Sequence, residues 1–431
     1  MILLNKYLIH IILYLIISAV HLVRADAQVI INCGTDVYHK QLLEEEVYML
    51  RHFKTENEIY NNQTKTNKSV VNTLYVIPVV FHLITRPGSQ SGNFYAGNPD
   101  DSTVISSFFA GLNQTYRNTG AFDQGVGADM EIEFCLASRD TNGNYTNGIT
   151  RLESCLTDSC GYMTNLFYTD SIKKITCWNP EKYLNIWIVA NMVDGSGFST
   201  FPWAPRNYLD GVMININYLT TDYVAGVMLA HETGHYFGLY HVFQGGCINY
   251  DCLLNGDKVC DTPPSTQQNI VVSCSDNTCN TDMDDTSINN PFSTDVSDNI
   301  RTYMNYGLPF CINQFTEGQK SRARICLETY RTQLLASDGC TINSIDFEDK
   351  PVNRILGISN ENNGEISVSF FYTGSLLIKI FDCRGICIYN KKVSANLNNN
   401  ITIKDLKPGF YIIRAIIEGE MQKEEKKFVV F

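Results

Sequence analysis

The chain has 431 residues, 44% of them hydrophobic and 11% aromatic, which excludes a disordered protein and allows two or three globular domains. Its formal net charge of −12 at pH 7 argues against binding to nucleic acid or to an anionic membrane surface. Fifteen cysteines are present. In an exported chain, so many cysteines imply disulfide bonds.

The first 27 residues are typical of an export signal. The apolar run YLIHIILYLIISAVHLV is followed by ADA at 25–27, a pattern that signal peptidases cleave. An uncleaved membrane anchor is the alternative, because the run is slightly long and is interrupted by His10 and His21. Residues 28–72 are polar and charged, so we expect a loosely ordered, cleavable segment there.

The next part of the chain alternates strand and helix patterns, which indicates an α/β domain over residues 73–342. Residues 245–300 are rich in Cys, Asp, Asn, Thr and Ser, and such a long irregular stretch needs cross-links or bound ions. The predicted strands are 74–84, 128–137, 184–193 and 211–219, and the predicted helices are 101–120, one that begins near Thr221 or Asp222, and 315–337.

Residues 343–431 differ in pattern, because short apolar strands alternate with turn residues. These strands predict a small all-β sandwich. They are EISVSFF, LLIKIFD, ITIKDL, GFYIIRAII and KKFVVF.

Three of the chain's eight histidines fall within eleven residues, in the stretch HETGHYFGLYH. His231 and His235 are four apart, so on a helix both imidazoles lie on one face. His241 would lie about 15 Å further along an unbroken helix and on another face. A shared metal site therefore requires the helix to end between His235 and His241, and Gly238 is suited to end it.

The pattern H-E-x-x-H-x-x-G-x-x-H predicts a catalytic zinc site. Three imidazoles leave one coordination position for water, whose pKa falls from about 15.7 to about 7 on zinc. Glu232 lies beside the metal rather than on it, so we expect it to take a proton from that water and pass it to the leaving amine. The reaction class is peptide hydrolysis. Scattered surface or core histidines are the alternative, and the three-histidine register disfavours them.

This stretch resembles the metzincin clan of zinc proteases, in which a methionine in a tight turn lies beneath the metal. The segment RTYMNYG offers Met304 for that turn. By the same resemblance, Tyr306 is expected to approach the zinc and stabilise the tetrahedral intermediate. Two ordinary core residues are the alternative.

Further motifs narrow the resemblance to the pappalysin family, over roughly residues 73–330. They are GDKVCDTP and YMNYG followed by CINQFTEGQKSRAR, with IPVVFHLI, GITR, YLNIWIV and GFSTFPW upstream. Family members of this type carry CGT in a pro-segment, and NCGTDVY supplies it here. The resemblance implies that the Cys33 thiolate binds the zinc and keeps the enzyme latent. The fourteen other cysteines could pair, which would leave Cys33 free; an unpaired cysteine left by chance is the alternative.

The resemblance also implies a structural calcium ion. The hard oxygen ligands would come from Asp257, Asp261 and Thr262, and the alternative is that these are solvated loop residues. It implies the disulfides Cys247–Cys274 and Cys279–Cys311, with Cys252 and Cys260 as an extra pair, although sequence alone does not determine connectivity.

Substrate is expected to lie extended along an edge strand formed by residues 197–203. Relatives often favour a basic residue just after the cleaved bond, but no pocket acid can be assigned here.

The last domain resembles the type A sorting domain of type IX secretion systems, through PVNRIL, IKIFDCRGICIYNKK and ITIKDLKPGFYIIRA. The usual PNP is missing and Cys383 and Cys387 are unusual, so a generic sandwich for adhesion or substrate binding is the alternative. The resemblance implies export machinery as a partner and an extracellular or cell-surface location.

The sequence thus predicts a secreted, latent zinc endopeptidase that acts on proteins or peptides. A zinc-holding adhesin or binding module without turnover is the rival, and the presence of the base Glu232 argues against it. A nonproteolytic zinc hydrolase is disfavoured by the extended histidine pattern.

Overall fold

The computed structural model divides the chain into two compact units, residues 1–341 and 342–431, each described by itself. The predicted export signal, residues 1–27, lies outside the described residues. The described residues of the first unit are 33–64, 73–86, 101–123, 125–267, 274–307 and 310–341. Those of the second are 354–360, 365–371, 373–382, 386–396, 399–407, 409–417 and 423–430.

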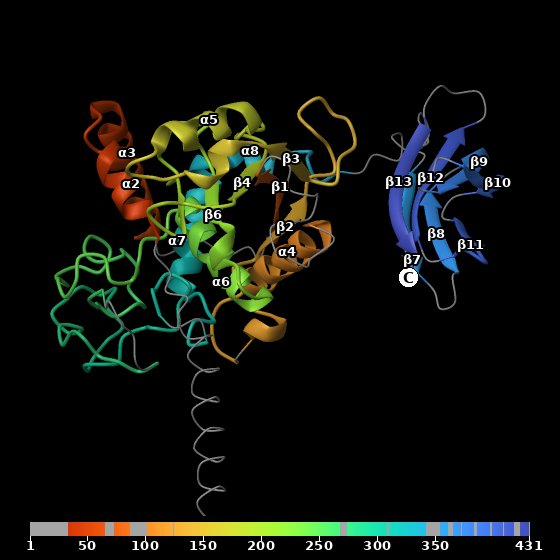
Figure 1. The fold of residues 1–431 in the computed structure, drawn as a ribbon. Helices are drawn as coiled ribbons and strands as arrows, with labels where there is room; N and C mark the ends of the chain where they lie inside the picture. The colour runs from red at the N-terminus through yellow and green to blue at the C-terminus, as the bar shows by residue number, and fades with distance from the viewer. Residues whose placement is uncertain are drawn as a thin grey trace, which may run out of the picture. The chain divides into compact units, whose positions relative to one another are not determined.

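The first unit is a mixed α/β domain, as the sequence predicts (Figure 1). Its helices are α2 (Thr35–Leu42), α3 (Glu46–Gln63), α4 (Asp101–Arg117), α5 (Leu166–Thr176), α6 (Asp222–Tyr236), α7 (Glu317–Tyr330) and α8 (Thr332–Leu335). Its strands are β1 (Tyr75–Thr85), β2 (Ile132–Leu136), β3 (Ile149–Glu153), β4 (Leu184–Val189), β5 (Gly197–Ser199) and β6 (Val212–Asn215).

These strands form one twisted sheet in the order β2-β1-β4-β6-β5, with β3 also paired to β1. All pairings are parallel except that of β5 with β6, which is antiparallel. The apolar run of β1 is buried at eight consecutive positions, as expected for a central strand covered on both faces. The short antiparallel strand β5 stands last in the strand order, so it forms one edge of the sheet.

Alternation along β4 sends its side chains to two different hydrophobic cores. Leu184, Ile186 and Ile188 pack with α4 and α6, whereas Trp187 and Val189 pack with residues of α5 and α2 on the other face. Helix α6, which carries the histidine motif, thus lies on the sheet between α4 and the β5 edge. Its N-terminus is where the sequence predicts, because the Thr221 side chain accepts a hydrogen bond from the Val224 amide.

The expectation of a loosely ordered segment before residue 73 is wrong for residues 33–64. They form α2 and α3, which pack against β5 and α7 of the same unit (Figure 1). Polar composition misled the prediction, because Glu56 in α3 is buried in an ion pair with Arg322 of α7 rather than solvated.

Two of the expected disulfides are also wrong. The structure joins Cys247 to Cys279 and Cys274 to Cys311. The segment around Cys279 lies against residue 247, since the Thr281 hydroxyl donates a hydrogen bond to the Cys247 carbonyl, whereas Cys274 packs beside Ile300 and Cys311. The extra pair Cys252–Cys260 is present as predicted, and Cys135–Cys340 ties β2 to the end of the unit.

Full pairing of the other fourteen cysteines is not observed. Cys33 is unbonded, and so are five other described cysteines: Cys155, Cys160, Cys177, Cys326 and Cys387. Cys160 and Cys326 are buried and serve as small core residues. Cys33 is therefore free as expected, but the expectation that all the other cysteines pair is wrong.

The second unit consists of two antiparallel sheets that share one hydrophobic core. The sheets have the orders β10-β9-β12-β13 and β11-β8-β7. This arrangement is the small β domain that the sequence predicts. Its strands are β7 (Arg354–Asn360), β8 (Ile366–Phe371), β9 (Thr373–Asp382), β10 (Cys387–Asn396), β11 (Asn399–Ile403), β12 (Gly409–Ile417) and β13 (Lys423–Val430).

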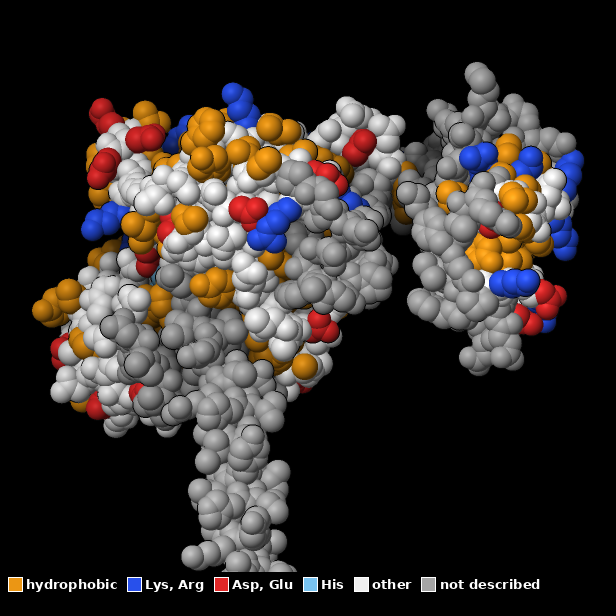
Figure 2. Space-filling model, in the orientation of Figure 1, with side chains coloured by type: hydrophobic (Ala, Val, Ile, Leu, Met, Phe, Trp, Pro, Cys, Tyr) orange, Lys and Arg blue, Asp and Glu red, His pale blue; other side chains and the backbone are white. Residues whose placement is uncertain are grey.

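Within the described part of the chain, no helix is long and apolar enough to cross a membrane. Acidic and basic side chains are interspersed on the face in Figure 2, and hydrophobic side chains gather over the region of α5. The exposed ones of α5 include Phe167 and Ile175.

Candidate metal centre and active site

Three histidines converge at the end of α6. The Nε2 atom of His241 lies 3.2 Å from Nε2 of His231 and 3.1 Å from Nε2 of His235. All three side chains are fully buried, and burial lowers the pKa of His231 to about 3 and that of His235 well below its usual value. The imidazoles of His231 and His235 are therefore neutral, which is the form that binds metal.

The tautomers follow from the other ring nitrogens. Nδ1 of His231 lies 2.6 Å from the Tyr303 carbonyl, and Nδ1 of His235 lies 2.7 Å from the Leu239 carbonyl. Since a carbonyl only accepts, each Nδ1 carries the proton and each Nε2 lone pair faces the common centre. Three imidazole nitrogens on a tetrahedral zinc lie about 3.3 Å apart, so the observed spacing fits zinc.

The chain reverses after α6 as the histidine pattern predicts. Gly238 has φ +90°, a conformation that favours glycine, and the Leu239 amide donates to the Gly234 carbonyl at 3.0 Å. A Cβ at Gly238 would lie 2.5 Å from Sγ of Cys326, so space as well as conformation requires glycine. This turn brings His241 back to the two histidines of the helix.

Glu232 is fully buried beside the three histidines. Burial raises the pKa of its carboxyl to about 8, while hydrogen bonds from Cys33 and Thr35 act in the opposite direction. Its Oε2 atom lies 3.5 Å from Sγ of Cys33 and 3.2 Å from Oγ1 of Thr35, and Oε1 has no hydrogen-bond partner. The carboxylate thus faces the site and is partly covered by the N-terminal segment.

Cys33 reaches the histidines from that segment. Its Sγ and one ring nitrogen from each of His231, His235 and His241 all lie within 4.8 Å of one another. Among the described residues, these four form the one group of His, Cys, Asp or Glu side chains close enough to hold a metal. Burial and the neighbouring Glu232 carboxylate raise the pKa of the Cys33 thiol well above its usual value.

The two residues after Cys33 have separate roles. A Cβ at Gly34 would lie 2.2 Å from the ring of Tyr162, so only glycine passes this aromatic side chain. Thr35 donates from its hydroxyl to Glu232 and accepts a 2.9 Å hydrogen bond from the Ser199 amide. The CGT motif therefore places the thiol over the histidines and a hydroxyl on the carboxylate.

Asp36 is a site residue that the sequence did not reveal. Its Oδ2 atom lies 2.6 Å from Nδ1 of His241. An acid directly after CGT was visible in the sequence, but nothing there connects it with a histidine 205 residues away.

Met304 and Tyr306 both lie at the site. Met304 is fully buried directly beneath α6, since a Cβ at Gly234 would lie 2.4 Å from its sulfur. The Tyr306 ring packs 4.8 Å from His241 and 5.8 Å from His231 between ring centres. Its hydroxyl donates a 3.0 Å hydrogen bond to the Cys33 carbonyl.

The expected edge strand is occupied by the same N-terminal segment. Cys33 forms a parallel bridge with Gly197 of β5, and the Gly34 amide donates to the Gly197 carbonyl at 2.8 Å. The edge expected to bind an extended substrate is thus covered by this chain's own residues.

The expected calcium residues are only partly brought together. The Thr262 hydroxyl lies 2.9 Å from both carboxylate oxygens of buried Asp257, and burial raises the pKa of Asp257 to about 8. Asp261 instead accepts from the Thr316 hydroxyl and the Gly318 amide, at the N-terminus of α7. Asp261 therefore has a different structural role, as a partner of that helix end.

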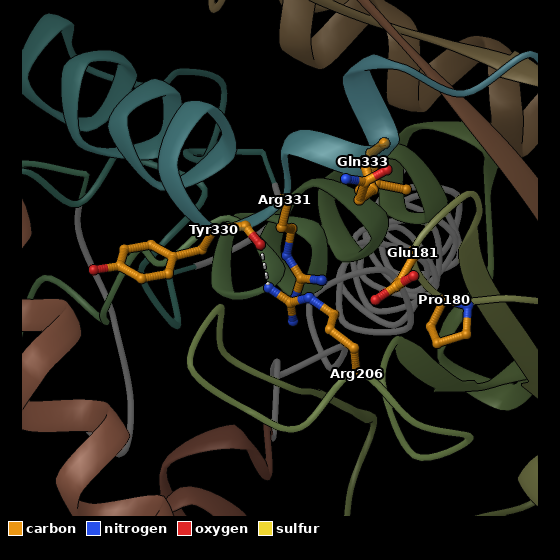
Figure 3. Close-up of a pocket in the computed structure, with 7 residues that line it drawn as sticks. Pro180, Glu181, Arg206, Tyr330, Arg331 and Gln333 are labelled. Atoms are coloured by element: carbon orange, nitrogen blue, oxygen red, sulfur yellow. Dashed lines mark hydrogen bonds between the residues drawn. The ribbon is translucent and has the colours of Figure 1, made fainter.

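A hollow of about 50 Å³ elsewhere in the unit is separate from this centre (Figure 3). Arg206 and Arg331 lie side by side there, and Arg206 donates to the Tyr330 carbonyl at 2.9 Å. The hollow includes none of the three histidines. It is lined by Pro180, Glu181, Arg206, Tyr330, Arg331, Gln333 and Leu334.

Comparisons with known proteins agree with this geometry. Residues 167–328 match the model of the Peptidase_M43 family, described as "Pregnancy-associated plasma protein-A", and residues 351–431 match the "Secretion system C-terminal sorting domain". Extracellular metalloproteases of Sordaria macrospora and Neurospora crassa are 28% and 27% identical over 312 residues. The match spans 70% of this chain and 89% of each relative.

A solved structure is also similar. A mutant of promirolysin from Tannerella forsythia superposes with a TM-score of 0.52 at 27% identity, covering 71% of this chain and 97% of that one. The resemblances to the pappalysin family and to the type IX sorting domain are thereby confirmed, as is the mixed α/β fold class with its C-terminal β domain. The chain is a secreted metalloprotease, with a peptidase domain of the pappalysin family and a C-terminal sorting domain of the type IX kind.

Proposed function

We propose that the chain is made as a latent zinc endopeptidase, in which Glu232 is the general base and residues 33–36 block the site. The observation that carries the proposal is the convergence of the Cys33 thiol with the three inward-facing histidine nitrogens, beside the Glu232 carboxylate. A zinc protease needs the three histidines but not a thiol at the same place. The Cys33 thiol is accounted for if it blocks the site in a latent form.

His231, His235 and His241 would hold the zinc. When bound there, zinc polarises a substrate carbonyl and makes water easier to deprotonate at neutral pH. Glu232 is positioned beside the histidines to accept a proton from water and return it to the leaving amine. Its burial supports this role, because a raised pKa brings a carboxyl closer to the operating pH of a general base.

Tyr306 is proposed to bind the carbonyl of the bond that is cleaved. Its hydroxyl donates to the Cys33 carbonyl, which is a peptide carbonyl in an extended segment along β5. A substrate paired with the same edge would offer an equivalent acceptor. Donors at that place stabilise the negative charge that develops on the oxygen.

Latency would result from three contacts acting together. The Cys33 thiol faces the three histidines, and the Thr35 hydroxyl donates a hydrogen bond to Oε2 of Glu232. The backbone of Cys33 and Gly34 pairs with the edge strand β5. Water, base and peptide edge are thus all blocked by one segment. Removal of this segment is the proposed activation step.

Proteins and peptides are the substrates, and the C-terminal domain engages secretion machinery. Loss of the signal, the pro-segment and the C-terminal domain on maturation completes the proposal. Calcium remains a proposal that rests on the buried Asp257 and Thr262 pair.

Casein digestion by the matured protein, with and without a zinc chelator, tests the proposed function. We expect the chelator to abolish digestion, added zinc to restore it, and Glu232→Ala to lack it while still binding zinc. Equal digestion by wild type and Glu232→Ala would show that the mechanism is wrong. Zinc binding without digestion by either would favour the adhesin.

A further inference from the structure

The three histidines differ in the group that accepts a hydrogen bond from Nδ1 of the ring. The acceptors for His231 and His235 are the backbone carbonyls of Tyr303 and Leu239, both in the catalytic unit. The acceptor for His241 is the side chain of Asp36, in the segment proposed to leave on activation. One of the three supports of the metal centre is thus removable.

The contact between Asp36 and His241 is close and partly buried. Oδ2 lies 2.6 Å from Nδ1, His241 is fully buried, and the Asp36 side chain is 32% exposed. The Asp36 carboxylate therefore accepts a hydrogen bond from Nδ1–H of His241, and the Nε2 lone pair is directed at the other two histidines.

Apart from His231 and His235, whose rings lie 5.1 and 4.5 Å from that of His241, two aromatic side chains contact the His241 ring. Phe243 stacks on it at 4.7 Å with an interplanar angle of 11°, and Tyr306 meets it edge-on at 4.8 Å. These contacts restrict the ring but provide no hydrogen-bond acceptor for Nδ1. A carboxylate that accepts a hydrogen bond from the second nitrogen of a metal-binding histidine fixes the ring orientation and raises its basicity. Loss of such a partner typically lowers metal affinity by about 10- to 100-fold.

We propose that Asp36 is a positioning residue that strengthens zinc binding through His241 in the latent form, so that release of the pro-segment loosens the metal centre. This inference rests on the proposed latent zinc site and adds a coupling between the pro-segment and metal retention. Cys33 would cap the metal, whereas Asp36 would act from behind a ligand that remains in the mature enzyme.

The test measures zinc release from the full-length chain to a chelator, with an indicator dye and metal analysis. All variants carry Glu232→Ala so that the pro-segment stays attached, which mass measurement verifies. Asp36→Ala should release zinc about 10- to 100-fold faster. Asp36→Asn, whose amide oxygen still accepts from Nδ1, should fall between. Glu44→Ala, an exposed acid of the same segment, is the matched control and should match the parent.

A second arm separates Asp36 from simple docking of the segment. In chains that also carry Cys33→Ala, the Asp36→Ala acceleration should persist, because it acts through His241. Its disappearance there, or an unchanged release rate for Asp36→Ala alone, would overturn the inference. A parent chain that binds no zinc at all would instead overturn the proposed function.

Discussion

Glu56 of α3 and Arg322 of α7 form a buried ion pair, with 2.6 Å between a carboxylate oxygen and Nη2 of the guanidinium. Their side chains are 10% and 1% exposed. Lys258 and the Tyr240 hydroxyl bind the same carboxylate at 2.8 and 2.9 Å. Tyr240 directly precedes His241, a proposed zinc ligand, so the N-terminal helices are anchored directly behind the proposed metal centre.

We expect Glu56→Gln to loosen the latent form. The substitution leaves Arg322 without its carboxylate, and breaking a buried pair costs about 3–5 kcal/mol. Intact chains should lose the N-terminal segment faster during autoactivation, measured by gel and terminal sequencing. Glu44→Gln, at an exposed position of the same segment, should activate at the wild-type rate. Equal rates for all three chains would show that the ion pair does not hold the segment.

Cys33→Ala should speed autoactivation more selectively. The thiol is lost from above the histidines, but the α2 and α3 anchors remain, so melting of the latent chain should change little. The time course of conversion to the mature form is the measurement. Conversion at the wild-type rate would reject a role for Cys33 in latency.

The parts of the site that follow local rules are those that the sequence predicted well. His231, His235 and the turn at Gly238 are set by helix geometry and by the backbone needs of one residue. The central strands β1 and β4 are continuous apolar runs, and the Thr221 cap is a local contact. No long-range information is needed for any of them.

The failures all depend on approach between distant segments. Cys247 meets Cys279 because two irregular loops pack together, and no spacing rule encodes that. Residues 46–63 form a helix whose polar composition suggested disorder, since its buried Glu56 finds Arg322 only in the folded protein. Asp36 reaches His241 for the same reason.

Tyr306→Phe should lower kcat of the mature enzyme by about 100-fold with a smaller effect on KM, because the lost hydroxyl is needed most as charge develops on the carbonyl oxygen. The ring would still pack at 4.8 Å from Phe243, so zinc content and folding should be retained. Steady-state kinetics on a quenched peptide, with metal analysis, checks this. A variant with wild-type kcat would exclude Tyr306 from the chemistry.

Calcium should stabilise the catalytic unit through Asp257. Removal of calcium with zinc retained should lower Tm, and Asp257→Asn should remove that difference. Asp261→Asn should instead lower Tm equally with and without calcium, because Asp261 holds the N-terminus of α7. Thermal unfolding of the three chains in calcium and in a calcium chelator decides, and an absent shift in wild type would count against a calcium site.

Asp210 should stabilise the C-terminal end of α6, where the histidines converge. Its carboxylate pairs with Nη1 of Arg331 at 2.8 Å, with both side chains fully buried, and Arg331 Nε donates to the Tyr236 carbonyl at the end of α6. Asp210→Asn should therefore lower the free energy of unfolding by about 3 kcal/mol at pH 7. Asp338→Asn, which breaks an exposed pair with Lys182, should cost at most about 1 kcal/mol.

The same carboxylate should make stability depend on pH in a defined direction. Burial alone would raise the pKa of Asp210, but the guanidinium groups of Arg331 and Arg206 hold it below its usual value. The folded chain then binds this proton less readily than the unfolded chain, whose aspartate titrates near about 3.9. Its stabilisation should be fully present above that pH and decline as pH falls toward the lower folded value. Denaturant unfolding from pH 7 to pH 3 should show a shallower decline for Asp210→Asn than for wild type; parallel declines would contradict the assignment.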